Sequence, residues 1–167
     1  MPINSNINVH EIVICANMFV KKDGKVLMLR RSPLKKILPN HVHPYGGKVD
    51  QSEDPMTAAI RELREEAGLE VENIKLEAVI TEVHTNTNNW QIFHFSGDYK
   101  GGEVLATEEG EAVMLSAAEL EDELLFASVK ELIRYILDPK IGPVFARFEY
   151  NEAGDKIVNK QINFTSV

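Results

Sequence analysis

A glycine-rich loop that leads into an acidic helix constrains this chain more than any other feature. The loop and helix occupy residues 46–69, GGKVDQSEDPMTAAIRELREEAGL. Asp54 is a good N-cap residue, and Pro55 suits the first helical position, where its missing N–H costs nothing. Gly68 can adopt the left-handed conformation that often ends a helix. Apolar residues at helical spacing predict a buried stripe made of Met56, Ala59, Ile60, Leu63 and Ala67.

The same helix carries a cluster of carboxylates. Glu62, Glu65 and Glu66 lie at i, i+3 and i+4, so their side chains share a face. Like charges at these spacings destabilise a helix by about 0.2–0.5 kcal/mol per pair. We expect Arg61 and Arg64 to project elsewhere and to neutralise the cluster only in part. A divalent cation such as Mg²⁺ would relieve the repulsion, because it takes oxygen ligands; the simpler alternative is a solvated face with ordinary ion pairs.

The complete pattern is more specific than the carboxylates alone. It reads G-x5-E-x7-R-E-U-x-E-E-x-G-U, where U is an aliphatic residue, and it resembles the signature of the Nudix hydrolases at every specified position. The resemblance in strand order extends more loosely over residues 10–138. The matching residues are Gly47, Glu53, Arg61, Glu62, Leu63, Glu65, Glu66, Gly68 and Leu69.

The Nudix resemblance implies an α/β fold, namely an α/β/α sandwich with a mixed curved sheet. We assign this domain to residues 1–142 and an extra C-terminal β-hairpin to residues 143–167. The resemblance also implies that the helix carboxylates bind Mg²⁺ or Mn²⁺, that one of them accepts the proton of an attacking water, and that Arg61 and Glu53 form a supporting ion pair. Glu65 is the leading candidate for the base.

A fourth metal-binding carboxylate is expected from an acidic loop further along the chain. Nudix enzymes often take a carboxylate from this region, just before a short strand, which we predict at residues 112–115. Glu111 matches the usual spacing, with Glu108 and Glu109 as competitors.

Several residues outside the helix are candidate substrate contacts. Gly46 and Gly47 allow the backbone to turn sharply or to approach a phosphate, and Arg31 is either a phosphate contact or a surface charge. His43 resembles a base-contacting position of relatives that hydrolyse oxidised purine nucleotides. Residues 126–128, Phe-Ala-Ser, stand where such relatives place acidic or amide base contacts, a departure that argues against specificity for oxidised purines. The full set is Arg31, His43, Tyr45, Gly46, Gly47, Lys48 and Ser128.

The resemblance points to a MutT-like nucleoside triphosphate pyrophosphatase, which would release a nucleoside monophosphate and pyrophosphate, and oxidised purine nucleotides are one candidate substrate class. Markers of other subfamilies are missing; position 84, for example, is His and not the proline of ADP-ribose hydrolases. The alternatives are another diphosphate (ADP-ribose, a nucleotide sugar or an isoprenoid diphosphate) and a non-catalytic nucleotide-sensing module. Sensing modules typically lack a glutamate of the signature, and this chain has them all.

Charge and composition exclude several other partners. The net charge is −8, with eight Lys/Arg and three Asp/Glu in residues 1–50 and ten against 23 in the remainder. An acidic chain is a poor ligand for long nucleic acid, whereas the basic first part suits a small polyphosphate. The longest nearly apolar run, residues 12–20, is too short to span a bilayer. No signal-peptide pattern is seen, and the single cysteine, Cys15, suits a reducing compartment, so we expect a cytoplasmic protein without membrane contact.

The remaining segments predict hairpins and short helices. Strands are expected at residues 10–20 and 25–31, and again at 73–84 and 90–99. Ser116 and Ser128 both begin capping-box sequences. His41 and His43 are close enough in sequence to ligate a metal, but a polar loop is the favoured interpretation.

The C-terminal hairpin is expected at residues 143–150 and 156–165. Its strands alternate so that one face is apolar, and a lone hairpin with such a face must be covered. It packs either on its own core or on a second subunit. We favour the homodimer, because an exposed strand edge promotes association.

Overall fold

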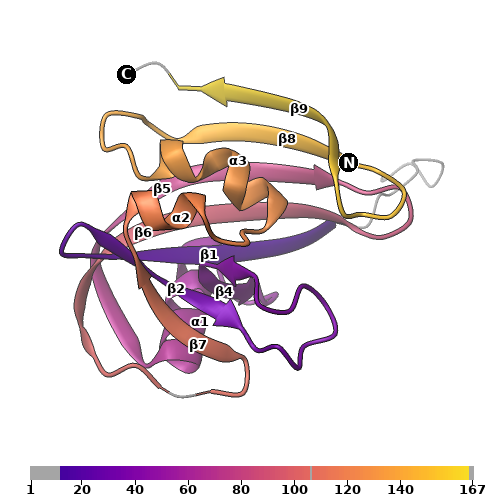
Figure 1. The fold of residues 1–167 in the computed structure, drawn as a ribbon. Coiled ribbons are helices and arrows are strands. Elements are labelled where there is room, and N and C mark those ends of the chain that lie inside the picture. The colour runs from indigo at the N-terminus through magenta and orange to yellow at the C-terminus, as the bar shows by residue number, and fades with distance from the viewer. Residues whose placement is uncertain (1–11, 106, 166–167) are drawn as a thin grey trace.

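The computed structural model describes residues 12–105 and 107–165, and their strands form a mixed open sheet with helices on both faces (Figure 1). The strand order is β3-β2-β1-β6-β5-β8-β9, with β4 paired to β1 and β7 paired to β2. This arrangement confirms the expected fold class. The elements are β1 (Ile12–Lys22), β2 (Lys25–Arg31), β3 (Val42–His43), β4 (Tyr45–Lys48), α1 (Pro55–Ala67), β5 (Leu69–Val83), β6 (Asn89–Gly102), β7 (Gly110–Leu115), α2 (Ala117–Glu121), α3 (Ala127–Ile136), β8 (Val144–Tyr150) and β9 (Ile157–Phe164).

Both predicted hairpins of the first hundred residues are confirmed. Strands β1 and β2 are antiparallel and meet at Asp23 and Gly24, which both have positive φ, 51° and 74°. Two such residues suit the tight turn that matches the twist of a hairpin. Strands β5 and β6 are also antiparallel and are longer than expected. Residues 10 and 11 of the first expected strand lie outside the described residues.

Helix α1 begins and ends as the sequence predicts. The side chain of Asp54 accepts hydrogen bonds from the backbone of the first turn, and Gly68 is left-handed with φ 68°. The predicted stripe is wrong at Met56, which is 44% exposed, because the buried arc includes Ala58 instead. This rotation turns Glu62, one turn beyond Ala58, toward strand β4.

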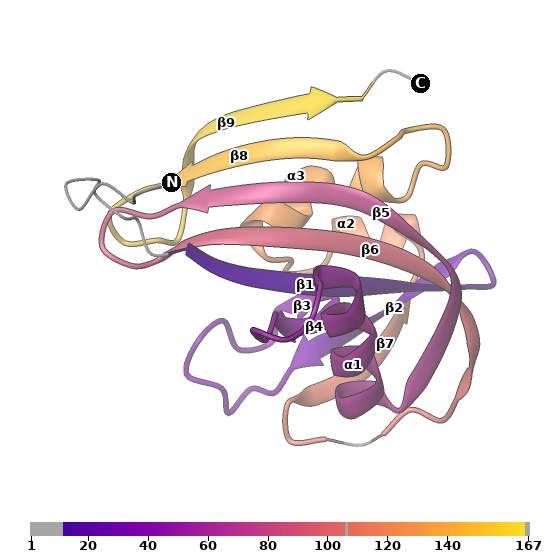
Figure 2. The same ribbon diagram turned by 180° about the vertical axis from the view of Figure 1, so that it is seen from behind.

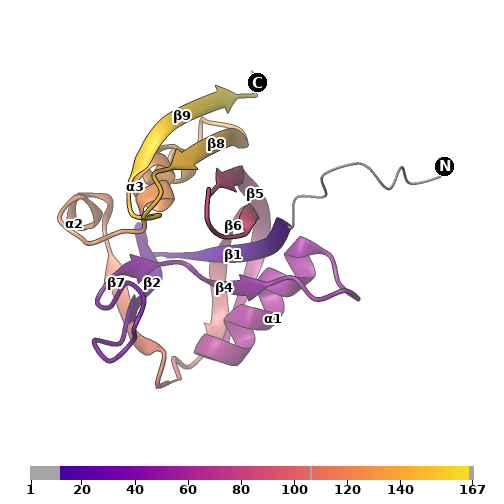
Figure 3. The same ribbon diagram turned by 90° about the vertical axis from the view of Figure 1, so that its right-hand side faces the viewer.

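The sheet separates two apolar cores. Helix α1 covers one face, where the buried residues include Tyr45 and Leu63. Helices α2 and α3 lie on the opposite face (Figures 2 and 3), where Phe19 and Leu132 belong to the second core. Within the described residues, no helix is long and apolar enough to cross a membrane.

The two expected capping boxes have different outcomes. Ser116 forms a complete box with Glu119 at the start of α2. The box expected at Ser128 is wrong, because the N-cap of α3 is Phe126 and Ser128 lies inside the helix. Ser128 is buried inside the helix, where its hydroxyl is unavailable as a cap.

The C-terminal hairpin extends the main sheet (Figure 2). Strand β8 runs parallel to β5, and β9 is antiparallel to β8 at the edge. The apolar face of β8 is buried in the core beneath α3, and Lys160 of β9 pairs with Glu131 of α3 at 2.8 Å. The chain therefore covers this face itself, which removes the reason for which we favoured a dimer. The buried face of β8 consists of Val144, Ala146, Phe148 and Tyr150.

Candidate active site

The glycines of strand β4 bring the backbone against the acidic helix. Gly47 pairs with Ala16 of β1, and a Cβ at Gly47 would lie 2.6 Å from the carboxylate carbon of Glu62. Gly46 has φ 154°, and a Cβ there would lie 2.2 Å from the carbonyl oxygen of Ala16. A Cβ at Gly46 would collide with backbone, whereas one at Gly47 would have to displace the carboxylate end of Glu62. The backbone N–H of Gly46 donates a hydrogen bond to Glu66 at 3.3 Å, so the loop positions two of the three helix carboxylates.

Arg61 lies among the other carboxylates of the site. Its guanidinium contacts Glu53 at 2.7 Å, Glu62 at 2.8 Å and Glu65 at 3.1 Å. These hydrogen bonds raise the pKa of Arg61 above its ordinary value and, chiefly through Arg61, lower the pKa of Glu53. The expected Arg61–Glu53 ion pair is present. The expectation that Arg61 projects away from the cluster is wrong, because its long side chain reaches back along the helix surface. Arg64 does project elsewhere, 3.8 Å from Glu70.

Glu66 is the helix carboxylate that Arg61 does not neutralise. Burial, together with the nearby charges of Glu62 and Glu109, raises the pKa of Glu66 to about 7. The Gly46 N–H and the charge of Arg31 act in the opposite direction. Glu66 is thus a partly buried carboxylate with neighbouring negative charge. The charges that act on it include Arg31 at the end of β2 and Glu109 in the loop before β7.

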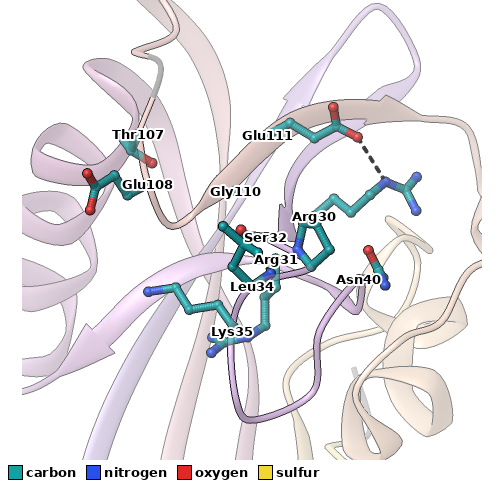
Figure 4. A pocket seen from close by; sticks show the side chains of 11 residues that line it. Arg30, Arg31, Ser32, Leu34, Lys35, Asn40, Thr107, Glu108, Gly110 and Glu111 are labelled. Carbon is teal, nitrogen blue, oxygen red and sulfur yellow. Dashed lines mark hydrogen bonds and ion pairs between the residues drawn. The ribbon is translucent and has the colours of Figure 1, made fainter.

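This electrostatic environment distinguishes the three candidates for the fourth carboxylate. Glu109 is near enough to affect the pKa of Glu66, and its own side chain is bound by Lys35 at 2.6 Å. Glu111 instead pairs with Arg30 at 3.3 Å (Figure 4) and is 71% exposed. Glu108 lines an adjoining cleft. Of the three, Glu109 is the one whose charge acts on Glu66, whereas Glu111, the first choice from sequence spacing, pairs with Arg30.

The carboxylates suit a divalent metal, although in the described residues they do not form a complete coordination site. Among the residues that the structure describes, no group of three or more His, Cys, Asp or Glu side chains is already arranged to hold an ion. The available donors are all oxygen atoms, as Mg²⁺ and Mn²⁺ prefer. Glu66 lies near two further carboxylates, and among the described residues no cationic side chain is bonded to it. A divalent ion would supply the missing positive charge, so the residues fit such an ion.

The predicted substrate contacts divide into accessible and buried residues. Tyr45 is only 1% exposed, packs in the core under α1 and has its pKa raised by burial to about 12. Ser128 is 4% exposed and also lies in a packed interface. Tyr45 is buried close enough to Glu66 for that carboxylate to help raise its pKa, but neither Tyr45 nor Ser128 is open to solvent. Lys48 is exposed, and its carbonyl oxygen accepts a hydrogen bond from Arg61 at 3.3 Å.

His43 is held in the neutral form beside Phe126. The two rings stack with centroids 4.9 Å apart, and burial lowers the pKa of His43 to about 4. Its Nδ1 lies 2.8 Å from the carbonyl oxygen of Pro44, whereas its buried Nε2 has no hydrogen-bond partner among the described residues. Because the neutral ring donates through Nδ1, Nε2 is left as an acceptor.

A cleft of about 850 Å³ is lined by Glu108 and Glu111 and by the basic residues at the end of β2 (Figure 4). Its walls are the end of β2, the loop that follows and the segment before β7. The sequence assigned no role to Asn40 or Thr107, because residues of two separate loops become neighbours only in the folded chain. The basic residues 35 and 36 were the only indication in the sequence that this loop could bind an anion. The cleft is lined by Arg30, Arg31, Ser32, Pro33, Leu34, Lys35, Asn40, Thr107, Glu108, Gly110 and Glu111.

Comparison with known proteins identifies the family. A family model described as NUDIX domain matches residues 10–139, which is most of the chain. The chain belongs to the Nudix family. Enzymes of the Nudix family hydrolyse phosphoric anhydrides and generally use divalent metals.

The Nudix relatives extend this finding. The uncharacterized Nudix hydrolase YvcI of Bacillus subtilis is 33% identical over 102 residues, which cover 56% of this chain and only 60% of that protein. A MutT protein from Bacillus halodurans has a TM-score of 0.79 at 20% identity, covering 90% of this chain and 97% of the other. An ADP-ribose pyrophosphatase from Streptococcus suis has a TM-score of 0.59 at 17% identity, covering 75% and 89%. At these identities the structural likeness is one of fold.

Proposed function

We propose that this chain hydrolyses a phosphoric anhydride bond in a nucleoside diphosphate derivative, using Mg²⁺ or Mn²⁺. The observation that carries the proposal is the position of Glu66. This carboxylate is partly buried beside Glu62 and within electrostatic range of Glu109, and it is held by the Gly46 N–H. Such a cluster of negative charge is unfavourable without a cation.

Each group at the site has a distinct part in this proposal. Glu62, Glu65 and Glu66, with Glu109 as the fourth carboxylate, would hold the metal. When bound, the metal would supply positive charge to the anhydride oxygens and would make a water molecule more acidic. Arg61 keeps Glu62 and Glu65 in place through its hydrogen bonds.

The remaining steps are a proton transfer and phosphate binding. Glu65 stays our candidate for the base, because it is 61% exposed and can reach water while bonded to Arg61. Glu66 is its competitor, because its pKa of about 7 is close to working pH. Arg31 has no carboxylate bonded to it among the described residues and would bind a phosphate oxygen.

The substrate proposed from the sequence is a nucleoside triphosphate, with release of a nucleoside monophosphate and pyrophosphate. A second candidate is a nucleoside diphosphate linked to a sugar, because the cleft lined by Arg31 and Gly110 has room for a further polar group. We place the reaction in the cytoplasm, with a small nucleotide as partner. A homodimer would have to use the free edge of β9, and light scattering of the full chain tests it.

A substrate screen tests the proposed reaction. ATP, GTP, 8-oxo-dGTP, ADP-ribose and UDP-glucose are each incubated with the chain in Mg²⁺, in Mn²⁺ and in EDTA. We expect release of a nucleoside monophosphate from at least one substrate, dependent on metal and abolished in Glu66→Gln. Absence of turnover in both metals, together with nucleotide binding by calorimetry, would instead establish the non-catalytic alternative.

A further inference from the structure

We propose that Asn17 and His94 are positioning residues for the metal site, because together they fix the backbone of Gly46, whose N–H holds Glu66. The inference rests on the proposed function and adds two residues that lie outside the Nudix signature. It follows from a row of residues across three strands, from the contact of Asn17 with the glycine loop, and from a buried histidine with an unsatisfied hydrogen-bonding group.

Gly46, Asn17 and His94 form one row across the sheet. Asn17 of β1 is paired with Gly46 of β4 on one side and with His94 of β6 on the other. The ring of His94 packs against Phe19, so the row faces the core beneath α3. The Nδ2 of Asn17 lies 3.4 Å from the Nδ1 of His94, and its Oδ1 would lie 2.4 Å from a Cβ at Gly46. The amide of Asn17 therefore connects the histidine to the glycine loop.

The backbone of Gly46 depends on its neighbours for its orientation. Its φ of 154° lies in a region that residues with a side chain rarely adopt, and glycine itself restricts the backbone little. The atoms closest to the position of its missing Cβ are the carbonyl oxygen of Ala16 and the amide oxygen of Asn17. The N–H of Gly46 donates to Glu66 at 3.3 Å. A change at Asn17 would therefore turn the peptide group that holds Glu66.

His94 has a polar group that the core does not satisfy. The residue is 1% exposed, and burial lowers its pKa to about 3, so the ring is neutral. Because Nδ1 accepts from Asn17, the ring proton is on Nε2, which has no partner among the described residues. A buried donor without a partner destabilises a fold, and an apolar side chain would avoid that loss. Packing alone does not account for a histidine here, whereas the contact with Asn17 does.

Calorimetric titration of Mn²⁺ into the metal-free full chain tests the inference. Asn17→Leu and His94→Leu keep a branched or bulky side chain but remove the hydrogen bond between the two residues. Each should raise the Kd for Mn²⁺ about tenfold, as is usual when a group that orients a metal ligand is lost. His94→Asn should bind Mn²⁺ as the wild type does, since its amide takes the place of Nδ1 and puts no atom at Nε2.

Ser96→Ala is the matched control for the Mn²⁺ titration. It removes another buried polar side chain from β6, whose hydroxyl donates to Glu77 and not to the row of Asn17. The Kd for Mn²⁺ should stay at the wild-type value. A tenfold rise in this variant as well would show that any loss of a buried polar group in β6 weakens the metal site, which overturns the specific role of His94.

Thermal midpoints of the metal-free variants separate positioning from packing. His94→Leu should unfold at or above the wild-type midpoint, because the unpartnered N–H is gone. His94→Asn should unfold at a lower temperature, because the smaller side chain leaves a cavity. Metal affinity and stability should thus change in opposite directions in these two variants. Weak Mn²⁺ binding only in the less stable variant would show a packing role and would overturn the inference.

The amide resonance of Gly46 separates this inference from the proposed function. In ¹H–¹⁵N spectra of the metal-free chain, it should move in Asn17→Leu and His94→Leu but not in Ser96→Ala. If the wild type binds no Mn²⁺, the proposed function fails, and the Gly46 resonance alone decides whether Asn17 and His94 position the loop. An unmoved resonance, or an unchanged Kd in both leucine variants, overturns the positioning role and leaves the hydrolase proposal intact.

Discussion

The carboxylate of Glu62 lies directly against the Cα of Gly47, where a Cβ would be only 2.6 Å from the carboxylate carbon. The contact is possible because α1 is rotated so that Ala58 and Glu62 point toward β4. Strand β4 is in turn paired with β1 in the middle of the sheet. The position of a proposed metal-binding carboxylate is therefore set by the absence of a side chain on a neighbouring strand.

Gly47→Ala should consequently impair catalysis more than stability. The added methyl would displace the flexible end of Glu62, which costs little folding free energy, but a shift of about 1 Å at a catalytic group lowers activity by about 100-fold. The measurements are kcat/KM and the thermal midpoint. Gly101→Ala is the control, because a Cβ at Gly101 would meet nothing within 4 Å. Equal effects of both substitutions would contradict the role of the contact.

Glu66→Gln should abolish turnover and stabilise the metal-free fold at neutral and higher pH. Burial raises the pKa of Glu66 to about 7, above the unfolded value of 4.5. The folded chain therefore holds a proton that the unfolded chain loses, and wild-type stability falls as pH rises from about 4.5 to about 7. Glutamine carries no charge, so Glu66→Gln avoids this decrease in the free energy of unfolding, which is about 2 kcal/mol after solvent screening.

Urea unfolding of the metal-free proteins at pH 5 and pH 8 checks the Glu66 prediction. We expect Glu66→Gln to exceed the wild type at pH 8 and the difference to shrink at pH 5. Saturating Mg²⁺ should stabilise the wild type at pH 8 and have little effect on the variant. A stability difference that does not change with pH would show that Glu66 is not the titrating group.

Arg61→Ala should lower kcat strongly, because three carboxylates lose the guanidinium that positions them. Arg61→Lys should recover little of the activity, since an ammonium cannot reproduce the forked contact with Glu53. Arg64→Ala, on the same helix and 65% exposed, serves as the comparison and should retain wild-type kcat. Normal activity of Arg61→Ala would remove Arg61 from the site.

Phe148→Ala should destabilise the fold by about 3–5 kcal/mol, because the ring is fully buried beneath α3. Phe145→Ala, on the opposite face of the same strand and 45% exposed, should cost about 0.5 kcal/mol. Urea unfolding measures both. Similar small losses would mean that the β8 face is not packed within its own chain, and would restore the argument for a second subunit.

Much of the fold could be predicted because its determinants are local. The caps of α1 at Asp54 and Gly68, the turn at Asp23 and Gly24 and the alternation of β8 each depend on neighbouring residues. Such determinants act through backbone conformation and periodicity, which a sequence displays directly. The prediction of a capping box at Ser128 was wrong because a non-local effect decided the outcome: the side chain of Ser128 is buried inside the helix, whatever its local pattern indicates.

The sequence by itself determined the family, the loop-and-helix unit and the identity of the helix carboxylates, because these are encoded by fixed spacing along one segment. Only the tertiary structure decided that Arg61 lies among the carboxylates, that Tyr45 is buried and that the charge of Glu109 acts on Glu66. It also decided what covers the C-terminal hairpin. These properties depend on which side chains meet across strands and loops that are distant in sequence, and on the charge and burial that result.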